Sequence, residues 1–208
     1  MKIVIAVPSG DMVHADFAFS MNSMIIHTLM KAVPIVAIVN KKGSIIHQAR
    51  CSLVDDARKA GATHIMFIDS DHVFPKDLIV RLAAANKDVI GVHSVTKRRP
   101  CRSNCEDMKY QRLTKPGVGV EEVIRLGTGL MLINMTVFDK MKMPYFNFKY
   151  ENGPLARVRG WIGEDYYFCE KARSAGFGIF VDHDLSKECF HIGNALYGVQ
   201  ELELPNGK

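Results

Sequence analysis

Residues 64–75 read HIMFIDSDHVFP, and this stretch decides the fold. The run from His64 to Ile68 has the apolar composition of a buried strand, and it ends at Asp69-Ser70-Asp71. Ligand sites in parallel α/β sheets lie beyond the carboxyl ends of the strands, which is where these two acids are expected. Two neighbouring carboxylates repel each other unless a cation or a hydrogen-bond donor balances them. The simpler alternative is a solvated turn before a helix that opens at Pro75.

The rest of the chain predicts a single α/β domain. Before residue 95, the pattern alternates between apolar strands and helices, which predicts a mostly parallel central sheet with helices on both faces, as in Rossmann-like folds. The strands are expected at 2–7, 35–39, 64–68 and 88–93, and the helices at 11–31, from 46 up to Gly61, and at 76–86. A short antiparallel part follows, with strands at 118–126, 130–133, 179–181 and 188–191 and helices at 136–141 and 164–175.

Composition excludes several classes of protein. The chain has 208 residues, of which 48% are hydrophobic and 24% charged, and this excludes disordered and low-complexity proteins. The longest apolar run, 24–39, is interrupted by polar residues and is short for a transmembrane helix. The N-terminus MKIVIAVPSG lacks the apolar core of a signal peptide. Five scattered cysteines fit reduced thiols. We therefore expect a cytoplasmic protein without membrane contact.

Two further motifs lie at the ends of expected elements, one at the end of a strand and one at the start of a helix. Pro8-Ser9-Gly10 closes the first expected strand. Glu164 and Asp165 open a helix, where the helix dipole favours negative charge. Simple capping of that helix would explain the two acids. An acid beside a cleft can also act as a general base toward a hydroxyl.

A histidine and an arginine are candidate ligands. His191 follows a short expected strand, and a neutral imidazole binds Mn²⁺ and related metals well, although a structural role is the more common one. Arg50 lies on the helix that precedes the Asp69 strand, with Ser44 as its expected N-cap. Its guanidinium could bind a diphosphate through two hydrogen bonds. A solvated helix face remains the equal alternative.

Residues 96–117 break the α/β pattern and are strongly basic. The segment contains Lys97, Arg98, Arg99, Arg102, Lys109, Arg112 and Lys115. It is expected to be a loop or insertion that either follows a phosphate backbone or covers a substrate. A zinc site using Cys101 and Cys105 would need two more ligands, for which Cys189 and His191 are weak candidates. The overall charge of +5 permits an anionic partner without requiring one.

Taken together in their order along the chain, these residues resemble the GT-A-fold nucleotide-sugar glycosyltransferases, especially those of family 2. The matching pieces are Pro8-Ser9, Arg50 within HQARCSLVDDARKAGATHIMFIDSDHVFP, Gly127-Thr128-Gly129 before LMLINMTVFDKM, Gly163-Glu164-Asp165, and His191. The resemblance implies one domain over 1–208. It would have a nucleotide-sugar half at 1–95, the basic insertion at 96–117, and an acceptor and catalytic half at 118–208.

The resemblance also implies a role for each matching residue. Asp71 would be the main ligand of Mn²⁺ or Mg²⁺, with His191 as a second ligand and Asp69 near the metal and the ribose or uracil. Asp165 would be the catalytic base, assisted by Glu164. The nucleoside diphosphate sugar would contact Pro8, Ser9, Arg50, Asp69, Ser70, Asp71 and Gly129. The acceptor would contact Gly127, Thr128, Trp161, Lys97, Arg98 and Arg99.

The implied reaction moves a sugar from a nucleoside diphosphate sugar, with UDP as the expected nucleotide, to an acceptor hydroxyl with inversion. One acceptor is hydroxylated or modified DNA, because the basic segment could hold phosphates while a base is flipped toward Asp165. A carbohydrate acceptor is the alternative. Two other classes stay open: a haloacid-dehalogenase-type phosphatase, whose first motif is also Asp-x-Asp-x-Val, and a non-catalytic nucleic-acid-binding protein. The oligomeric state is not predicted.

Overall fold

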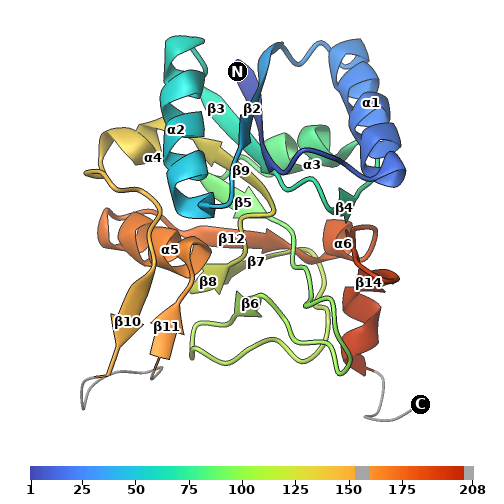
Figure 1. Cartoon of the computed structure of the whole chain (residues 1–208), viewed down its shortest axis with the longest axis vertical. Helices are drawn as coiled ribbons and strands as arrows, with labels where there is room; N and C mark the ends of the chain where they lie inside the picture. Colours follow the sequence, from blue (N-terminus) through green and yellow to red (C-terminus); the bar gives the residue numbers. More distant parts are fainter. Residues whose placement is uncertain (153–159, 204–208) are drawn as a thin grey trace.

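The computed structural model describes residues 1–152 and 160–203, and a seven-stranded mixed sheet runs through its centre (Figure 1). The strand order is β2-β1-β3-β9-β5-β12-β7. Five strands run parallel: β1 (Ile3–Ser9), β2 (Ile35–Lys42), β3 (His64–Ile68), β5 (Val89–Gly91) and β12 (Ile179–Asp182). Two run antiparallel to them: β7 (Val120–Val123) and β9 (Leu130–Asn134). The mostly parallel sheet predicted from the sequence is confirmed.

Helices cover both faces of this sheet (Figure 1). One face packs against α2 (Ile46–Lys59), α4 (Met135–Asp139) and α5 (Glu164–Ser174). The other packs against α1 (Ala15–Met30), α3 (Leu78–Ala84) and the short α6 (His183–Ser186). Side chains of β1 alternate between the two cores, since Val4 and Ala6 join the first and Ile3 and Ile5 the second. Both faces are therefore buried, which is why these strands read as continuous apolar runs.

Three small antiparallel sheets surround the carboxyl end of the central sheet. The first contains β4 (His72–Val73), β13 (Phe190–Ile192) and β14 (Leu196–Gly198), and is followed by the 3₁₀-helix η1 (Val199–Glu203). The second pairs β6 (Cys105–Glu106) with β8 (Arg125–Leu126), and the third pairs β10 (Lys149–Glu151) with β11 (Gly160–Ile162). The expected antiparallel C-terminal part is thus present. The sequence did not predict β4, although it carries part of the site.

Some helix ends differ from the sequence prediction. Ser44 does not cap α2, because the residue at the N-cap is Ile45 and no side chain makes a capping hydrogen bond there. Helix α1 begins only at Ala15, and α3 begins at Leu78, with Pro75 in the preceding turn. By contrast, the amide of Thr136 donates to the side chain of Asn134, which caps α4.

The basic segment 96–117 is a folded part of the domain. It contains β6, and backbone hydrogen bonds such as Asn104 N to Ser94 O and Leu113 N to Cys105 O tie it to its flanks. It lies beyond the carboxyl ends of the central strands (Figure 1). The five cysteines form no disulfide in the structure. Within the described ranges, no helix has the length and apolar character that a membrane span requires.

Candidate active site

A buried arginine organises the end of β3. The Nη2 atom of Arg50, on α2, donates to both carboxylate oxygens of Asp69 at 2.9 and 3.0 Å. Its Nε atom lies 3.5 Å from Oε1 of Glu164, the first residue of α5. Arg50 is only 3% exposed, so its charge is held between two acids. The guanidinium thereby joins α2, β3 and α5, and its positive charge offsets the repulsion between the two acids.

Asp71 and two histidines form a second cluster beside this one. Oδ1 of Asp71 lies 3.2 Å from Nδ1 of His72 and 3.5 Å from Nε2 of His191. Its other oxygen, Oδ2, contacts the ammonium group of Lys97. Burial opposes ionisation of Asp71, but the contacts with His191, His72 and Lys97 outweigh it and hold the pKa of Asp71 far below its usual range. Asp71, His72 and His191 lie close enough together to bind one metal ion.

The residue types in this second cluster fit a divalent cation. Neither ring nitrogen of His72, nor Oδ1 of Asp71, has a hydrogen-bond partner among the described residues. Buried polar atoms without a partner are costly, and a bound ion would satisfy them. Carboxylate oxygen and imidazole nitrogen are both ligands of Mn²⁺-type ions.

The Gly127-Thr128-Gly129 turn must lack side chains at both glycines. A Cβ atom on Gly129 would lie 2.8 Å from Cε1 of His72 and 3.1 Å from a carboxylate oxygen of Asp69. A Cβ atom on Gly127 would overlap the side chain of Asn104. The carbonyl of Gly129 also accepts the amide of Asp69 at 2.7 Å. The two glycines therefore permit the close approach of the turn to the end of β3.

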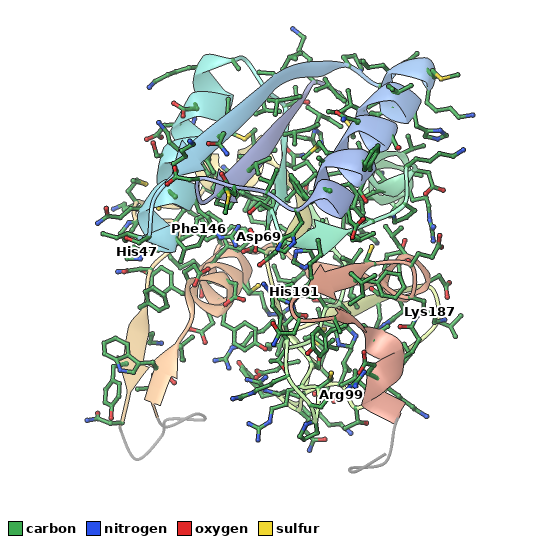
Figure 2. The ribbon with its side chains drawn as sticks, turned by 45° about the vertical axis from the view of Figure 1, so that its right-hand side comes forward. His47, Asp69, Arg99, Phe146, Lys187 and His191 are labelled. Carbon is green, nitrogen blue, oxygen red and sulfur yellow. The ribbon has the colours of Figure 1, made fainter. Side chains whose placement is uncertain are left out.

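Two adjoining cavities open at this end of the sheet. The first, of about 200 Å³, is lined by residues that include Arg50, Asp69, His72, Thr128, Gly129 and His191. The second, of about 260 Å³, is lined by residues that include Arg112, Arg125, Trp161, Ile162 and Tyr166. Thr96, Asn104 and Asp165 border both. Asp69 and His191 lie near the middle of the molecule, between the helices above and the basic segment below (Figure 2).

Asp165 lies where the two cavities meet. It is partly buried in the first turn of α5, and its Oδ1 accepts the amide of Tyr166 at 2.8 Å. Burial, with a smaller contribution from the charge of Glu164, raises the pKa of Asp165 to about 6. A carboxylate with this pKa is well matched to accept a proton near neutral pH.

Aromatic side chains lie at the second cavity. Trp161 on β11 is 72% exposed and packs edge-to-face against Tyr150 of β10, with the ring centroids 5.3 Å apart. Arg125, which lines the same cavity, is buried between Glu106 and Glu170. An exposed indole beside a cavity offers a flat apolar surface for stacking.

Most of the site residues predicted from sequence meet at these cavities. Those that line one or both are Arg50, Asp69, Gly127, Thr128, Gly129, Trp161, Glu164, Asp165 and His191, and Asp71 and Lys97 lie directly beside the first. Others lie outside the cavity walls. Ser9, next to Pro8 at the end of β1, accepts a hydrogen bond from Asn40, and Ser70 lies in the turn after β3. Arg99 pairs with Glu201 at 2.8 Å, while Arg98 is exposed.

Several residues of the site were not singled out from the sequence, among them His72 and Asn104. His72 directly follows the second acid of the motif, and Asn104 lies in the basic segment. His72 is carried by β4, whose two residues give no detectable periodicity. Its position immediately after Asp69-Ser70-Asp71 was the available signal.

No protein-family model and no curated protein matches the chain. Solved structures do. A197 from STIV matches the whole chain over 97% of its own length, with a TM-score of 0.60 and 16% identity. Drosophila beta-1,4-galactosyltransferase 7, a mutant solved with manganese, UDP-Gal and xylobiose, matches 95% of the chain over 70% of its length, with a TM-score of 0.53 and 12% identity.

A third solved structure, TarS 1–349 from S. aureus, matches 95% of the chain with a TM-score of 0.51 and 14% identity. The chain spans 60% of that TarS fragment. The galactosyltransferase and TarS are GT-A-type glycosyltransferases. The similarities show the fold, a single α/β domain of the GT-A type, at low sequence identity.

Proposed function

We propose that this protein is a metal-dependent glycosyltransferase, which moves a sugar from a nucleoside diphosphate sugar to an acceptor hydroxyl. One observation carries the proposal. Asp165, whose pKa is raised to about 6, lines both the cavity next to a carboxylate–histidine cluster and the cavity with an exposed tryptophan. A donor in the first cavity and an acceptor in the second would meet at this carboxylate. Support also comes from the fold, since the similar galactosyltransferase was solved with manganese, UDP-Gal and xylobiose.

The catalytic step follows from that arrangement. Asp165 removes the proton of the acceptor hydroxyl while the hydroxyl oxygen bonds to the anomeric carbon. The bond between that carbon and the diphosphate oxygen breaks, and the electron pair leaves with the nucleoside diphosphate. Attack from the face opposite the leaving group inverts the anomeric configuration. Glu164, which is held by Arg50, assists acceptor binding.

Asp71 and His191 would hold the divalent cation, Mn²⁺ or Mg²⁺, with Asp69 beside them near the ribose. When bound, such a cation neutralises the charge that develops on the leaving diphosphate. Pro8, Ser9 and Ser70 would border the nucleotide, which we expect to be a uridine nucleotide. Arg50 already pairs with Asp69 and Glu164, so we propose that it orients these acids in addition to any contact with the diphosphate.

The acceptor has two candidates. The exposed Trp161 and Tyr150 beside the second cavity favour a carbohydrate, since sugars stack on aromatic rings. The basic segment favours DNA that carries a hydroxylated base. Four of its cations are exposed, and their side chains make neither an ion pair nor a hydrogen bond among the described residues, namely Arg98, Arg102, Lys109 and Lys115. Phosphatase chemistry is less well supported, because the fold neighbours include glycosyltransferases.

Thermal unfolding with a panel of nucleotides and nucleotide sugars tests the proposal. A ligand that binds only the folded state raises the melting temperature. We expect a rise with one nucleoside diphosphate that requires Mn²⁺, and its loss in Asp71→Ala. No rise with any nucleotide would overturn the proposal.

Transfer is then measured with glycans and hydroxymethylated DNA side by side. Asp165→Asn is expected to keep the nucleotide-dependent rise and to lose transfer. If Asp165→Asn instead loses the rise, Asp165 contributes to donor binding and is not the base.

A further inference from the structure

The pairing of β4 with β13 fixes two imidazoles next to each other. In the antiparallel register, His72 lies opposite His191. Their rings are stacked, with centroids 4.5 Å apart and an angle of 17° between the planes. The amide of Ile192 also donates to the carbonyl of Asp71 at 2.7 Å, which holds the carboxylate at the same pair of strands. The backbone therefore brings one acid and two histidines together before any ligand binds.

The hydrogen bonds determine which atoms are free to bind. A carbonyl oxygen only accepts, so Nδ1 of His191, 2.8 Å from the carbonyl of Val95, carries the proton. In the neutral ring, the lone pair of His191 is then on Nε2, which faces Oδ1 of Asp71. A metal-bound histidine commonly donates its other N–H to a carbonyl in this way.

His72 is the unexplained member of the cluster. Its side chain is 2% exposed, and neither ring nitrogen has a hydrogen-bond partner among the described residues. Its nearest polar contact in the described part of the chain is the 3.2 Å approach of Nδ1 to Oδ1 of Asp71, and Nε2 has none there. Leaving a buried ring nitrogen without a hydrogen-bond partner is destabilising, so the presence of His72 at this position needs an explanation.

We propose that His72 is a third protein ligand of the metal centre, and that the resulting set of two imidazoles and one carboxylate selects transition-metal ions over Mg²⁺. The inference rests on the proposed function for the presence of a metal and extends it to the ligand set and the metal's identity. Ligands held at about 2.1 Å from one ion are about 3.0–3.4 Å apart at octahedral or tetrahedral angles. The observed distances from Oδ1 of Asp71 to the two imidazoles, 3.2 and 3.5 Å, are close to this range, and all three ligand atoms lie within 4.8 Å of one another.

The selectivity follows from the ligand types. Imidazole nitrogen suits transition metals, whereas Mg²⁺ prefers oxygen ligands and keeps several waters. With Asp71 as the single carboxylate, the centre offers Mg²⁺ one favourable oxygen and offers Mn²⁺ or Co²⁺ three good ligands. Lys97 contacts only Oδ2 of Asp71, so Oδ1 stays available to the ion.

Mn²⁺ titration followed by electron paramagnetic resonance tests the proposal without any sugar donor. We expect His72→Gln to weaken Mn²⁺ binding at least tenfold and to reduce the preference for Mn²⁺ over competing Mg²⁺. His64→Gln is the matched control, because His64 is at the opposite end of β3, away from the cluster. Unchanged Mn²⁺ affinity in a folded His72→Gln protein would overturn the proposal.

A second measurement needs no variant, since His72 is buried and its replacement could unfold the protein. Proton NMR of the Co²⁺-loaded wild-type protein reports the exchangeable N–H of each coordinated imidazole as a strongly shifted resonance. Two such resonances are expected, one from each ring. A single shifted N–H would exclude His72 as a ligand.

These readouts separate this inference from the proposed function. Metal binding through both histidines, with no nucleotide-dependent rise in melting temperature, would leave the ligand assignment intact and overturn the glycosyltransferase proposal. If nucleotide raises the melting temperature in the presence of Mn²⁺ while His72→Gln leaves Mn²⁺ affinity unchanged, the glycosyltransferase proposal is supported and His72 is excluded as a ligand.

Discussion

At the scale of single residues, Asp165 links stability to function. Burial raises its pKa to about 6, against about 3.9 in an unfolded chain. Between these values the folded protein retains a proton that the unfolded chain releases. The free energy of unfolding therefore falls as the pH rises through this window. At neutral pH, ionised Asp165, the proposed catalytic base, destabilises the fold.

Asp165→Asn should therefore raise the melting temperature at pH 7.5 and change it much less at pH 4, where the aspartate is protonated in the folded state. Calorimetry at the two pH values measures the difference. Asp184→Asn is the control of opposite sign: Lys187 and the amide of Gly119 lower the pKa of Asp184, so its loss should not stabilise the protein. An equal shift for Asp165→Asn at both pH values would show that its charge is not the cause.

The same pKa predicts the pH dependence of the reaction. The base must be ionised, so kcat/KM should rise with pH through about 6 and level off above it. Asp165→Glu, which keeps a carboxylate, should retain such an ascending limb at reduced rate. A rate independent of pH between 5 and 8 would contradict a role for Asp165 as the base.

Lys97 is expected to weaken cation binding at the proposed metal centre. Its ammonium contacts Oδ2 of Asp71, and a cation at Oδ1 would be repelled by it. Lys97→Met should lower the Kd for Mn²⁺ several-fold in a direct titration. Lys109→Met, an exposed lysine of the same segment, should leave the Kd unchanged. Weaker binding in Lys97→Met would show that Lys97 instead orders the carboxylate.

At the scale of elements, the sequence predicted the strands and helices that are long enough to show a periodic apolar pattern. Strand β3 was predicted with its observed ends, and α2 and α5 nearly so, because long apolar patterns report which face is buried. The two-residue β4 and three-residue β13 have no such pattern, yet their pairing brings His72 to His191. The pairing is a tertiary event, so the third member of the cluster was not predictable from local sequence.

Arg50 illustrates the same limit. Its position on α2 was evident, but the carboxylates that it contacts come from β3 and α5. Arg50→Met should lower the free energy of unfolding by about 3–5 kcal/mol, since it leaves two partly buried acids without their cation. Arg58→Met on the same helix removes an exposed pair with Asp139 and should cost no more than about 1 kcal/mol. Urea denaturation of both variants measures the contrast, and equal losses would contradict this role of Arg50.

At the scale of the whole molecule, the basic segment sets the electrostatic character of the face around the site. The sequence predicted its charge but neither its folded state nor the pairing of Lys97 and Arg99 with acids. Four exposed cations have side chains with neither an ion pair nor a hydrogen bond among the described residues: Arg98, Arg102, Lys109 and Lys115. If the acceptor is DNA, these groups are the ones that contact phosphates.

DNA binding with phosphate contacts has a recognisable salt dependence. Four contacts to a duplex predict a slope of about −3 to −4 in a plot of log K against log salt, because each releases a condensed counterion. Fluorescence anisotropy between 50 and 200 mM salt measures it. Replacing the four cations by glutamine should abolish the slope. As a control, Lys2, Lys31, Lys87 and Lys140 are replaced by glutamine. This makes the same change in net charge near the amino ends of the parallel strands, opposite the site, and should preserve the slope. Equal losses in both variants would mean that net charge alone attracts DNA, and the acceptor would then be sought among glycans at Trp161.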